Sequence, residues 1–365
     1  MKSKRRKLAF ILFPFSYLYG IIVSFRNFLF NKGILKSTQF PFPVVSVGNI
    51  TVGGTGKTPH TEYIISILKE KWNIATLSRG YKRKTNKFQF VSTTSTVAEV
   101  GDEPRQMKQK FPNIIVAVDN DRVNGIKEIK SKHPKIDIVI LDDAFQHRKV
   151  KAGLNILLTD FNRPMFSDSL LPIGDLRENI KSMKRADIVI ITKTPENYKP
   201  IEQRLFLQNY QILEHQFAFF TKYEYKEIVN IFSKKKYSLS TLSNKPIIAV
   251  TGIASAEPFI NKISEFSKKI QHFEFPDHHN FSTSDFKKIE TAVQKIADEK
   301  PYLITTEKDA TRIKEMTNLS NLLKENFFFI PVEVAFFSSK DETFFVNLLQ
   351  KFALQDRKIS SIYLN

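Results

Sequence analysis

A glycine-rich segment from Gly48 to Thr58 contains the residue types that bind phosphate groups. Glycines let backbone N–H groups approach phosphate oxygens, and a helix that follows them adds the positive end of its dipole. We expect Lys57 to bridge the β- and γ-phosphates of a nucleotide and Thr58 to ligate Mg²⁺. The strict motif has Gly at position 51, where this chain has Thr51. The residues expected to bind the nucleotide here are Gly53, Gly54, Thr55, Gly56, Lys57 and Thr58.

Two adjacent acids, Asp142 and Asp143, follow the run 136–141, which is apolar except for Asp137. Such a run is typical of a buried parallel strand. A carboxylate at the carboxyl end of such a strand is where P-loop proteins hold Mg²⁺, directly or through water. The two motifs together therefore predict a site for a nucleotide and Mg²⁺.

A third apolar run, 188–191, ends in Thr192, Lys193, Thr194 and Pro195. This order resembles the base-reading loop of GTP-binding proteins, which needs an Asp where this chain has Pro195. The missing carboxylate favours adenine over guanine, and hence ATP. We expect Lys193 to pack against the base, although an exposed lysine after a strand fits the pattern equally well.

Asp102 and Glu103 are adjacent acids between Gly101 and Pro104, an arrangement that predicts a constrained loop. In a phosphoryl-transfer site, one acid can accept the proton of an attacking hydroxyl and the other can bind Mg²⁺. Spacing alone favours a different interpretation, namely a solvated acidic turn.

His278 lies in the segment 275–281, which is the densest histidine site in a chain with seven histidines. A metal site would need another ligand at suitable spacing, and the sequence offers none nearby. A lone histidine in a loop is more often a hydrogen-bonded structural residue. His278 can instead orient or tune a catalytic Asp from another domain.

An ordered set of elements is needed to bring these residues together. Apolar runs alternating with helical stretches between residues 44 and 193 predict a parallel α/β sheet. A second unit begins with the strand 247–252. The predicted fold class is therefore α/β, a P-loop NTPase parallel-sheet domain with a second, smaller α/β domain and an N-terminal membrane-associated helix. The predicted boundaries are 1–32 for that helix, 33–225 for the P-loop domain, 226–245 for a linker, 246–335 for the smaller domain and 336–365 for a segment returning to the P-loop domain.

The N-terminus combines a basic cluster with 18 uncharged residues from Leu8 to Phe25. No small-residue cleavage site follows, which excludes a signal peptide. A full span would place the nucleotide site outside the cell, because basic residues keep the N-terminus cytoplasmic. Pro14 and Gly20 are expected to kink a straight span. We therefore expect a helix in the inner leaflet rather than a buried capping helix. The basic residues are Lys2, Lys4, Arg5, Arg6 and Lys7.

The composition limits the partners of this chain. Lys and Arg total 56 against 37 Asp and Glu, and this excess of +19 favours anionic partners. Nucleic acid, an anionic bilayer and a phosphorylated substrate all qualify, but the sequence has no recognition motif for nucleic acid. With no Cys, disulfides, zinc–thiolate sites and thiol catalysis are excluded.

In the order and spacing of its motifs, the chain resembles the tetraacyldisaccharide 4′-kinases, the lipid A 4′-kinases of Gram-negative bacteria. Two positions depart from the family pattern, Ala144 in place of Gly and Asp175 in place of a small or basic residue. The motifs are SVGNITVGGTGKTP (46–59), LSRGYKRK (77–84), GDEP (101–104), DNDRVNG (119–125), LDDAFQH (141–147), LLPIGDLRE (170–178), ITK (191–193), FPDHHNFS (275–282) and TTEKDA (305–310).

The resemblance implies roles for individual residues. Asp102 matches the catalytic base and His278 its partner, while Lys57 matches the phosphate-binding lysine. Arg122 and Arg177 match basic residues near the cleft, which would neutralise charge on the transferred phosphoryl group. The residues that match the metal-binding set are Thr58, Glu103, Asp142 and Asp143.

The implied activity is transfer of the ATP γ-phosphate, with Mg²⁺, to the 4′-hydroxyl of a tetraacylated glucosamine disaccharide 1-phosphate. The implied fold joins two α/β domains by a two-stranded linker, and the N-terminal helix docks on the cytoplasmic face of the inner membrane. The expected partners are that lipid substrate and membrane lipids, with no nucleic acid and no obligate protein partner. The alternative is a membrane-associated P-loop ATPase or GTPase switch without lipid kinase activity.

Overall fold

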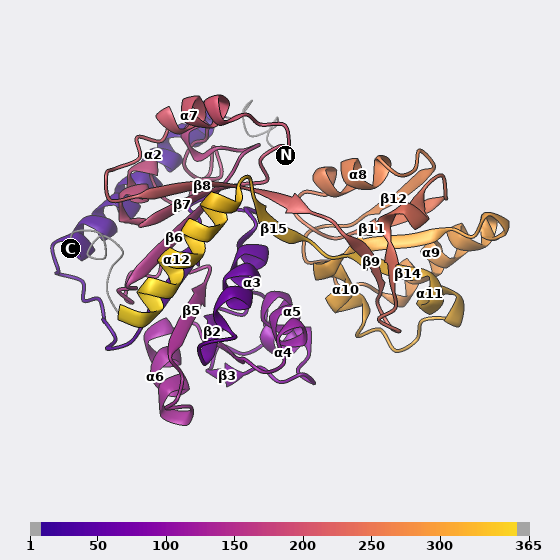
Figure 1. The fold of residues 1–365 in the computed structure, drawn as a ribbon, viewed down its shortest axis with the longest axis horizontal. Helices are drawn as coiled ribbons and strands as arrows, with labels where there is room; N and C mark the ends of the chain where they lie inside the picture. Colours follow the sequence, from indigo (N-terminus) through magenta and orange to yellow (C-terminus); the bar gives the residue numbers. More distant parts are fainter. Residues whose placement is uncertain (1–8, 356–365) are drawn as a thin grey trace.

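A computed structural model describes residues 9–355 of the chain, and the basic cluster at residues 2–7 lies outside these residues. The described chain forms two lobes, one built on a nine-stranded sheet and the other on a six-stranded sheet (Figure 1). Each sheet follows the chain in an α/β order, as the apolar runs predict.

The larger sheet has the strand order β15-β8-β7-β6-β1-β5-β2-β4-β3. Neighbouring strands from β8 to β4 are parallel, while β15 and β3 add antiparallel strands at the two edges. Its strands are β1 (Val44–Gly48), β2 (Ile74–Ser78), β3 (Gln89–Phe90), β4 (Ile115–Val118), β5 (Ile138–Asp142), β6 (Leu154–Asp160), β7 (Ile188–Thr192), β8 (Phe217–Glu224) and β15 (Glu333–Phe336).

Helices cover both faces of this sheet, so its central strands are buried throughout. On one face, α3 and α12 pack Ile64, Phe345 and Leu349 against the strands. On the other face, α6 contributes Ile126 and Ile129. The helices of this lobe are α2 (Ala9–Asn31), α3 (Lys57–Leu68), α4 (Val97–Val100), α5 (Asp102–Lys110), α6 (Arg122–Lys132), α7 (Pro200–Gln208) and α12 (Ser339–Gln355), with short 3₁₀ turns η1 (Met165–Ser167) and η2 (Ile180–Arg185).

The smaller sheet has the order β10-β9-β14-β13-β11-β12, with a parallel centre and two antiparallel strands at one edge. Its strands are β9 (Glu227–Asn230), β10 (Lys236–Ser238), β11 (Ile247–Thr251), β12 (Ile270–Glu274), β13 (Tyr302–Thr306) and β14 (Phe327–Ile330). Its helices are α8 (Glu257–Ser264), α9 (Thr283–Lys295), α10 (Glu307–Ile313) and α11 (Asn321–Asn326), with 3₁₀ turns η3 (Leu239–Leu242) and η4 (Ala297–Glu299).

The chain crosses between the lobes twice, from β8 to β9 and from β14 back to β15. The prediction that 226–245 is a linker is therefore wrong, because β9, β10 and η3 within this range belong to the smaller lobe. Its polar, basic sequence is explained by β10, an edge strand whose residues are exposed. After the second crossing, α12 packs on the larger sheet through Phe345 and Phe352, and residues 356–365 of the predicted returning segment lie outside the described residues.

Candidate active site

The glycine-rich segment joins the carboxyl end of β1 to the start of α3. Gly53 and Gly56 have φ angles of 102° and 86°, a left-handed conformation that glycine adopts without steric cost. A Cβ at Gly56 would also overlap the Tyr223 hydroxyl on β8. Thr51 has no such φ angle and forms an isolated antiparallel bridge with Leu176. Glycine is therefore not required at position 51, which explains how this segment tolerates the departure from the strict motif.

Lys193, directly after β7, forms a hydrogen bond with the glycine-rich segment. Its Nζ donates to Asp160 Oδ2 at 2.7 Å and also to the carbonyl oxygen of Gly54. Burial lowers the pKa of Lys193, and the charge of Asp160 opposes that effect. Thr192 Oγ1 donates to the carbonyl oxygen of Thr55 at 2.9 Å. These contacts brace the glycine-rich segment, and a contact of Lys193 with the base stays a prediction.

The acidic pair lies beside the same segment, because Asp142 of β5 is paired in register with Val47 of β1. Lys57 Nζ lies 3.6 Å from Asp143 Oδ1, and Arg177 Nη1 lies 3.3 Å from the same oxygen. Burial favours a higher pKa for Asp143, but the charges of Lys57 and Arg177 hold its pKa below the usual range. Asp143 is therefore an ionised group between two cations.

Asp142 has a different environment. Thr61 Oγ1 donates to its Oδ1 at 3.1 Å, while burial and the charge of Asp143 raise the pKa of Asp142 to about 7. A buried carboxylate that faces a second carboxylate favours a divalent cation, and Mg²⁺ prefers oxygen ligands. Thr58 offers a hydroxyl in the first turn of α3. The donor set of Thr58, Asp142 and Asp143 therefore fits Mg²⁺.

Arg122 is the first residue of α6 and is buried near these acids. Its Nη1 donates to the carbonyl oxygens of Asp119 and Asn120 at 2.8 and 3.3 Å. Burial lowers the pKa of Arg122 to about 10, while the charges of Asp143 and Asp142 oppose that effect. Arg122 remains a buried cation at the carboxyl edge of the larger sheet.

Asp102 and Glu103 do not lie in a solvated loop, so that interpretation is wrong. They are the first residues of α5, and Asp102 is only 2% exposed. Gly101 precedes them with a φ angle of 91°, which turns the chain from α4 into α5. The two acids instead face the smaller lobe across the gap between the lobes.

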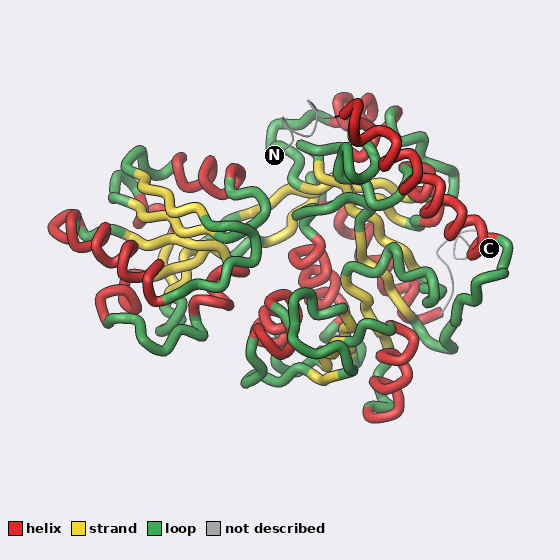
Figure 2. Tube along the Cα trace, turned by 180° about the vertical axis from the view of Figure 1, so that it is seen from behind, coloured by secondary structure: helices red, strands yellow, loops and turns green. Residues whose placement is uncertain are grey.

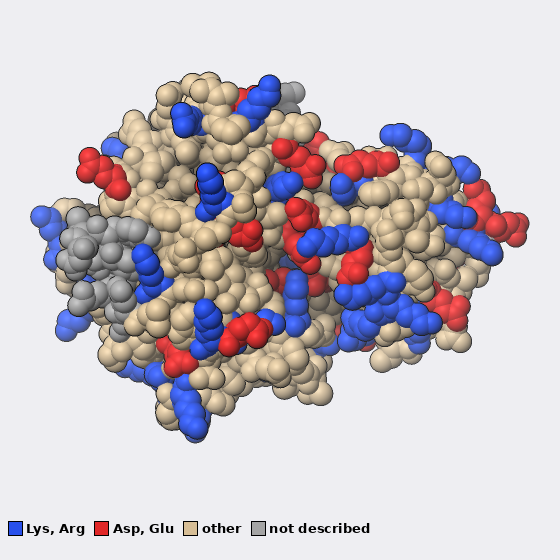
Figure 3. All heavy atoms as spheres, in the orientation of Figure 1, with Lys and Arg blue, Asp and Glu red and all other residues tan. Residues whose placement is uncertain are grey.

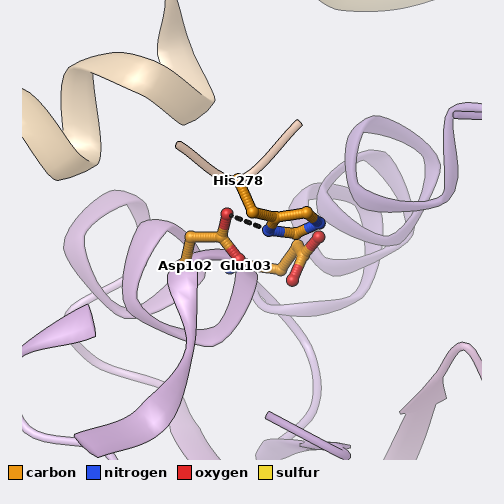
Figure 4. Close-up of side chains that lie close together, drawn as sticks. All are labelled: Asp102, Glu103 and His278. Carbon is orange, nitrogen blue, oxygen red and sulfur yellow. Dashed lines mark hydrogen bonds and ion pairs between the residues drawn. The ribbon is translucent and has the colours of Figure 1, made fainter. Parts of the chain in front are cut away.

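His278 reaches Asp102 from the smaller lobe, and its Nδ1 lies 2.9 Å from Asp102 Oδ2 (Figure 4). His278 lies after β12 with a φ angle of 58°, and its backbone N–H donates to the carbonyl oxygen of Gly252 at 3.1 Å. The two lobes thus bring together residues that lie 176 positions apart in the chain.

Two further residues of this cluster, Lys308 and Arg312, carry no role in the sequence-based prediction. Lys308 Nζ lies 3.0 Å from Glu103 Oε1, and Arg312 Nη1 donates to Asp102 Oδ2 at 3.3 Å. The TTEKDA segment at 305–310 was a signal for Lys308, whereas Arg312 lies just beyond it. Both residues project from α10, which the sequence alone does not place beside α5.

These cations set the charge state of the acids. Burial favours a higher pKa for Asp102, but the hydrogen bond with His278 and the charge of Lys308 hold its pKa well below the usual range. Burial raises the pKa of Glu103, although Lys308 opposes that shift. Asp102 is therefore the ionised member of the pair.

The side chains of Asp102, Glu103 and His278 are close enough together to hold a metal ion. Lys308 Nζ already lies 3.6, 3.0 and 3.2 Å from one atom of each of them. A second cation at this point would be repelled by the ammonium group. The assignment of Glu103 to the metal-binding set accordingly stays a prediction.

The helix α2 lies on the outside of the larger lobe (Figure 2). Tyr19 Oη donates to the carbonyl oxygen of Arg177 at 2.9 Å, and Ser16 Oγ donates to that of Leu170 at 3.0 Å. The helix is continuous through Pro14 and Gly20. A Cβ at Gly20 would lie 2.8 Å from Leu170 Cδ1, so the glycine serves close packing.

The opposite face of α2 is exposed and apolar, so the interpretation as a buried capping helix is wrong. Within residues 9–355, α2 is the one helix whose length and composition would let it cross a membrane, and little of it is buried. The large apolar residues of α2 that are exposed by more than half are Phe10, Ile11, Phe13, Phe15, Tyr17, Leu18, Ile22 and Phe25.

A P-loop at the carboxyl edge of a parallel sheet, followed by an acidic pair at the end of the neighbouring strand, defines a P-loop nucleotide-binding protein of the α/β class. The pair of Asp102 and His278, in which Asp102 begins a helix that contacts α3, adds a group able to accept a proton. This combination is typical of a phosphotransferase with an alcohol acceptor.

Comparison with known proteins identifies the family. The family model described as tetraacyldisaccharide-1-P 4′-kinase matches residues 8–353. The chain is 41% identical to the tetraacyldisaccharide 4′-kinase of Bacteroides thetaiotaomicron, covering 91% of this chain and 90% of that protein. Identity to the protein of that name from Phocaeicola vulgatus is 43%, covering 92% and 93%. The chain therefore belongs to the tetraacyldisaccharide-1-P 4′-kinase family.

A solved structure agrees with this conclusion. The "apo" form of LpxK from Aquifex aeolicus, crystallised in complex with ATP, is 30% identical in sequence. Its TM-score to this structure is 0.72, over 93% of this chain and 98% of that one. The two-lobed architecture is therefore shared across a large part of both chains.

Proposed function

We propose that this chain is a lipid kinase that transfers the γ-phosphate of ATP to the 4′-hydroxyl of a tetraacyldisaccharide 1-phosphate in lipid A biosynthesis. The observation that carries the proposal is the buried Asp102, hydrogen-bonded by His278, at the start of a helix that contacts α3, the helix after the P-loop. A switch ATPase or GTPase has no need for a proton acceptor that serves an alcohol. Membership of the 4′-kinase family supports the same choice.

In this reaction, Asp102 accepts the proton of the 4′-hydroxyl while the hydroxyl oxygen forms a bond to the γ-phosphorus. The bond between that phosphorus and the oxygen bridging to the β-phosphate breaks, and ADP leaves. Lys57, Arg122 and Arg177 oppose the negative charge that spreads over the transferred group. Positioning and electrostatics together supply most of the acceleration.

A bound Mg²⁺ would neutralise phosphate charge during transfer. Thr58, Asp142 and Asp143 would hold the ion, and Glu103 is the further candidate acid. Backbone N–H groups between Gly53 and Thr58 would bind the phosphates of ATP. These assignments rest on residue chemistry and on the positions of the side chains around β1 and β5.

We place the protein on the cytoplasmic face of the bacterial inner membrane, as a peripheral or monotopic protein. The apolar exposed face of α2 supports contact with membrane lipids, because a large apolar surface is unfavourable in water. The partners are the acylated disaccharide substrate and those lipids, with neither nucleic acid nor an obligate protein partner.

The test is transfer of label from γ-labelled ATP to tetraacyldisaccharide 1-phosphate in detergent micelles. Wild type is compared with Asp102→Ala and Lys57→Ala, and with Asp137→Asn as a control at the opposite end of β5. We expect wild type and the control to label the lipid. The two site variants should label it at a rate lower by about 100-fold or more. ATP or GTP hydrolysis by wild type without labelled lipid would favour the switch alternative and overturn the proposal.

A further inference from the structure

Lys308 is the one lysine of α10, and it lies at the centre of the acidic cluster although it comes from the smaller lobe. Its Nζ lies 3.0 Å from Glu103 Oε1 and 3.2 Å from His278 Nε2. Its side chain is 23% exposed, so the ammonium group is largely withdrawn from water. Figure 3 shows charged side chains gathered along the hollow between the lobes.

The contact with His278 has a chemical consequence for the imidazole ring. An ammonium group has three donors and no acceptor. The Nε2 atom that faces Lys308 must therefore accept, and a nitrogen that accepts carries no hydrogen. The hydrogen of the neutral ring is then on Nδ1, where it is donated to Asp102 Oδ2 at 2.9 Å.

We propose that Lys308 is a positioning residue for phosphoryl transfer, because it fixes His278 in the tautomer that carries its hydrogen on Nδ1 and thereby orients Asp102. Lys308 acts through His278 and does not contact the reacting atoms. The kinetic part of this inference rests on the proposed kinase function. The structural part, the tautomer, stands on the contacts alone.

The orientation of Asp102 follows from how its two oxygens are used. Oδ2 accepts a hydrogen bond from His278 Nδ1 at 2.9 Å and another from Arg312 Nη1 at 3.3 Å. It also lies 3.6 Å from Lys308 Nζ. Oδ1 accepts a hydrogen bond from the backbone N–H of Glu103 at 3.2 Å, and the Glu103 carboxyl group is a further hydrogen-bond partner of Asp102. We therefore assign Oδ1 as the oxygen that takes the substrate proton.

One neighbouring group favours the opposite tautomer. Asp277 Oδ2 lies 3.7 Å from His278 Nε2 and would accept a hydrogen from it. Lys308 Nζ is closer to Nε2 than Asp277 is. It also lies 3.9 Å from Asp277 Oδ1, so Lys308 and His278 compete as partners of the Asp277 carboxylate. The Tyr81 ring packs on His278 with its centroid 5.1 Å away and offers no charge. Removing the ammonium group should therefore let Nε2 take the hydrogen.

The test uses the full chain in detergent micelles, with histidine labelled with ¹⁵N. Side-chain nitrogen spectra distinguish a ring nitrogen that carries hydrogen from one that does not, and His278→Asn identifies the signals of His278. The variants are Lys308→Met, Lys308→Arg and, as control, Lys314→Met, an exposed lysine immediately after α10. Thermal unfolding and ATP binding verify that each variant is folded.

We expect hydrogen on Nδ1 in wild type, in the control and in Lys308→Arg, which keeps a donor. Lys308→Met should move hydrogen to Nε2 and lower kcat by about 10- to 100-fold, because orientation of the proton acceptor is lost. KM for ATP should change by less than about threefold, since the P-loop is untouched. Lys308→Arg should recover part of kcat.

Three results would overturn the inference: hydrogen on Nε2 in wild type, an unchanged tautomer in Lys308→Met, or an unchanged kcat in that variant. A fall in kcat with the tautomer unchanged therefore counts against Lys308 acting through His278. If wild type phosphorylates no lipid, the proposed function fails, whereas the tautomer spectra still decide the structural part.

Discussion

Asp142 and Asp143 are adjacent in the chain, yet the structure gives their carboxyl groups opposite environments. Asp143 lies between Lys57 and Arg177, which hold its pKa below the usual range despite burial. Asp142 has a hydroxyl donor and an acidic neighbour, and burial raises its pKa to about 7. Adjacent acids can therefore take different parts, one as a fixed negative charge and one as a group that gains from a bound cation.

At the scale of residues, we predict the effect of Arg177→Gln. Loss of the guanidinium should lower kcat/KM by about 100-fold, because we propose that this cation opposes the charge of the transferred phosphoryl group. The free energy of unfolding should change by less than about 1 kcal/mol, since the ion pair with Asp143 is partly exposed. Kinetics with labelled ATP and denaturant unfolding measure the two quantities. Arg204→Gln, on the exposed side of α7, is the control, and equal activity of the two variants would contradict the prediction.

At the scale of elements, the start of α3 is connected to β8 by one buried histidine. His60 Nδ1 lies 2.8 Å from the Gly56 carbonyl oxygen, and its Nε2 lies 2.9 Å from Thr221 Oγ1. Burial lowers the pKa of His60 to about 4. Because β8 continues into the smaller lobe, this pair of contacts links the P-loop to one of the two crossings between the lobes.

This histidine predicts a dependence of stability on pH. The unfolded chain binds a proton at His60 near pH 6.5, whereas the folded chain resists it down to about pH 4. The contribution of the neutral His60 to the free energy of unfolding is complete above pH 6.5 and is lost as the pH falls towards 4. Relative to His60→Gln, wild type should lose about 2 kcal/mol of unfolding free energy between pH 7.5 and pH 5. Denaturant unfolding at both values measures this, and parallel pH profiles for the two proteins would refute it.

The helix α2 gives the second prediction for an element. Ile11, Leu18 and Ile22 lie on its exposed apolar face. Changing all three to Ser should weaken binding to anionic phospholipid vesicles by at least about 10-fold per residue, from the apolar area that each side chain buries. Activity in detergent micelles should change far less, since the contacts of Tyr19 and Ser16 with the larger lobe remain.

Cosedimentation with vesicles measures the binding of that variant. Leu354→Ser, an exposed leucine at the end of α12, is the control for surface hydrophobicity in general. If the α2 variant sediments with vesicles as wild type does, α2 is not the main membrane contact of this protein.

At the scale of the whole molecule, the active site depends on how the two lobes meet. The contacts run between α5 on one side and α10 on the other. Glu315 accepts from Arg105 Nη1 at 2.6 Å and from the backbone N–H of Val97 at 2.7 Å, and these three residues bridge the lobes. The chain also joins the lobes at its two crossings, and we predict that the lobes move relative to each other when substrates bind.

Glu315→Gln tests this view of the lobes. Removing the charge should make the association of the two lobes less favourable by about 1 kcal/mol. This change corresponds to a rise of about fivefold in KM for the lipid. The radius of gyration from small-angle scattering should increase slightly in the absence of substrate. The control is Glu299→Gln, whose ion pair with Lys269 lies entirely within the smaller lobe. A variant with unchanged KM and unchanged dimensions would show that this pair does not hold the lobes together.

Much of this protein is determined by its sequence alone. The run at 188–191 and the strand predicted from residue 247 are found as buried strands, because continuous apolar residues satisfy a parallel sheet covered on both faces. The glycine-rich segment is found between a strand and a helix for a local reason, since Gly53 and Gly56 adopt positive φ angles. Such features depend on neighbours in the chain, and the sequence therefore predicts them.

Only the tertiary structure decided the surroundings of Asp102. Its sequence neighbours indicate a solvated turn, but α10 and the loop after β12 cover it with Lys308, Arg312 and His278. The strands β9 and β10 were likewise missed. β10 is an exposed edge strand, which needs no apolar run, and β9 is a strand of four residues between β10 and β14. Burial and charge at these positions come from residues distant in the chain, and no local pattern contains that information.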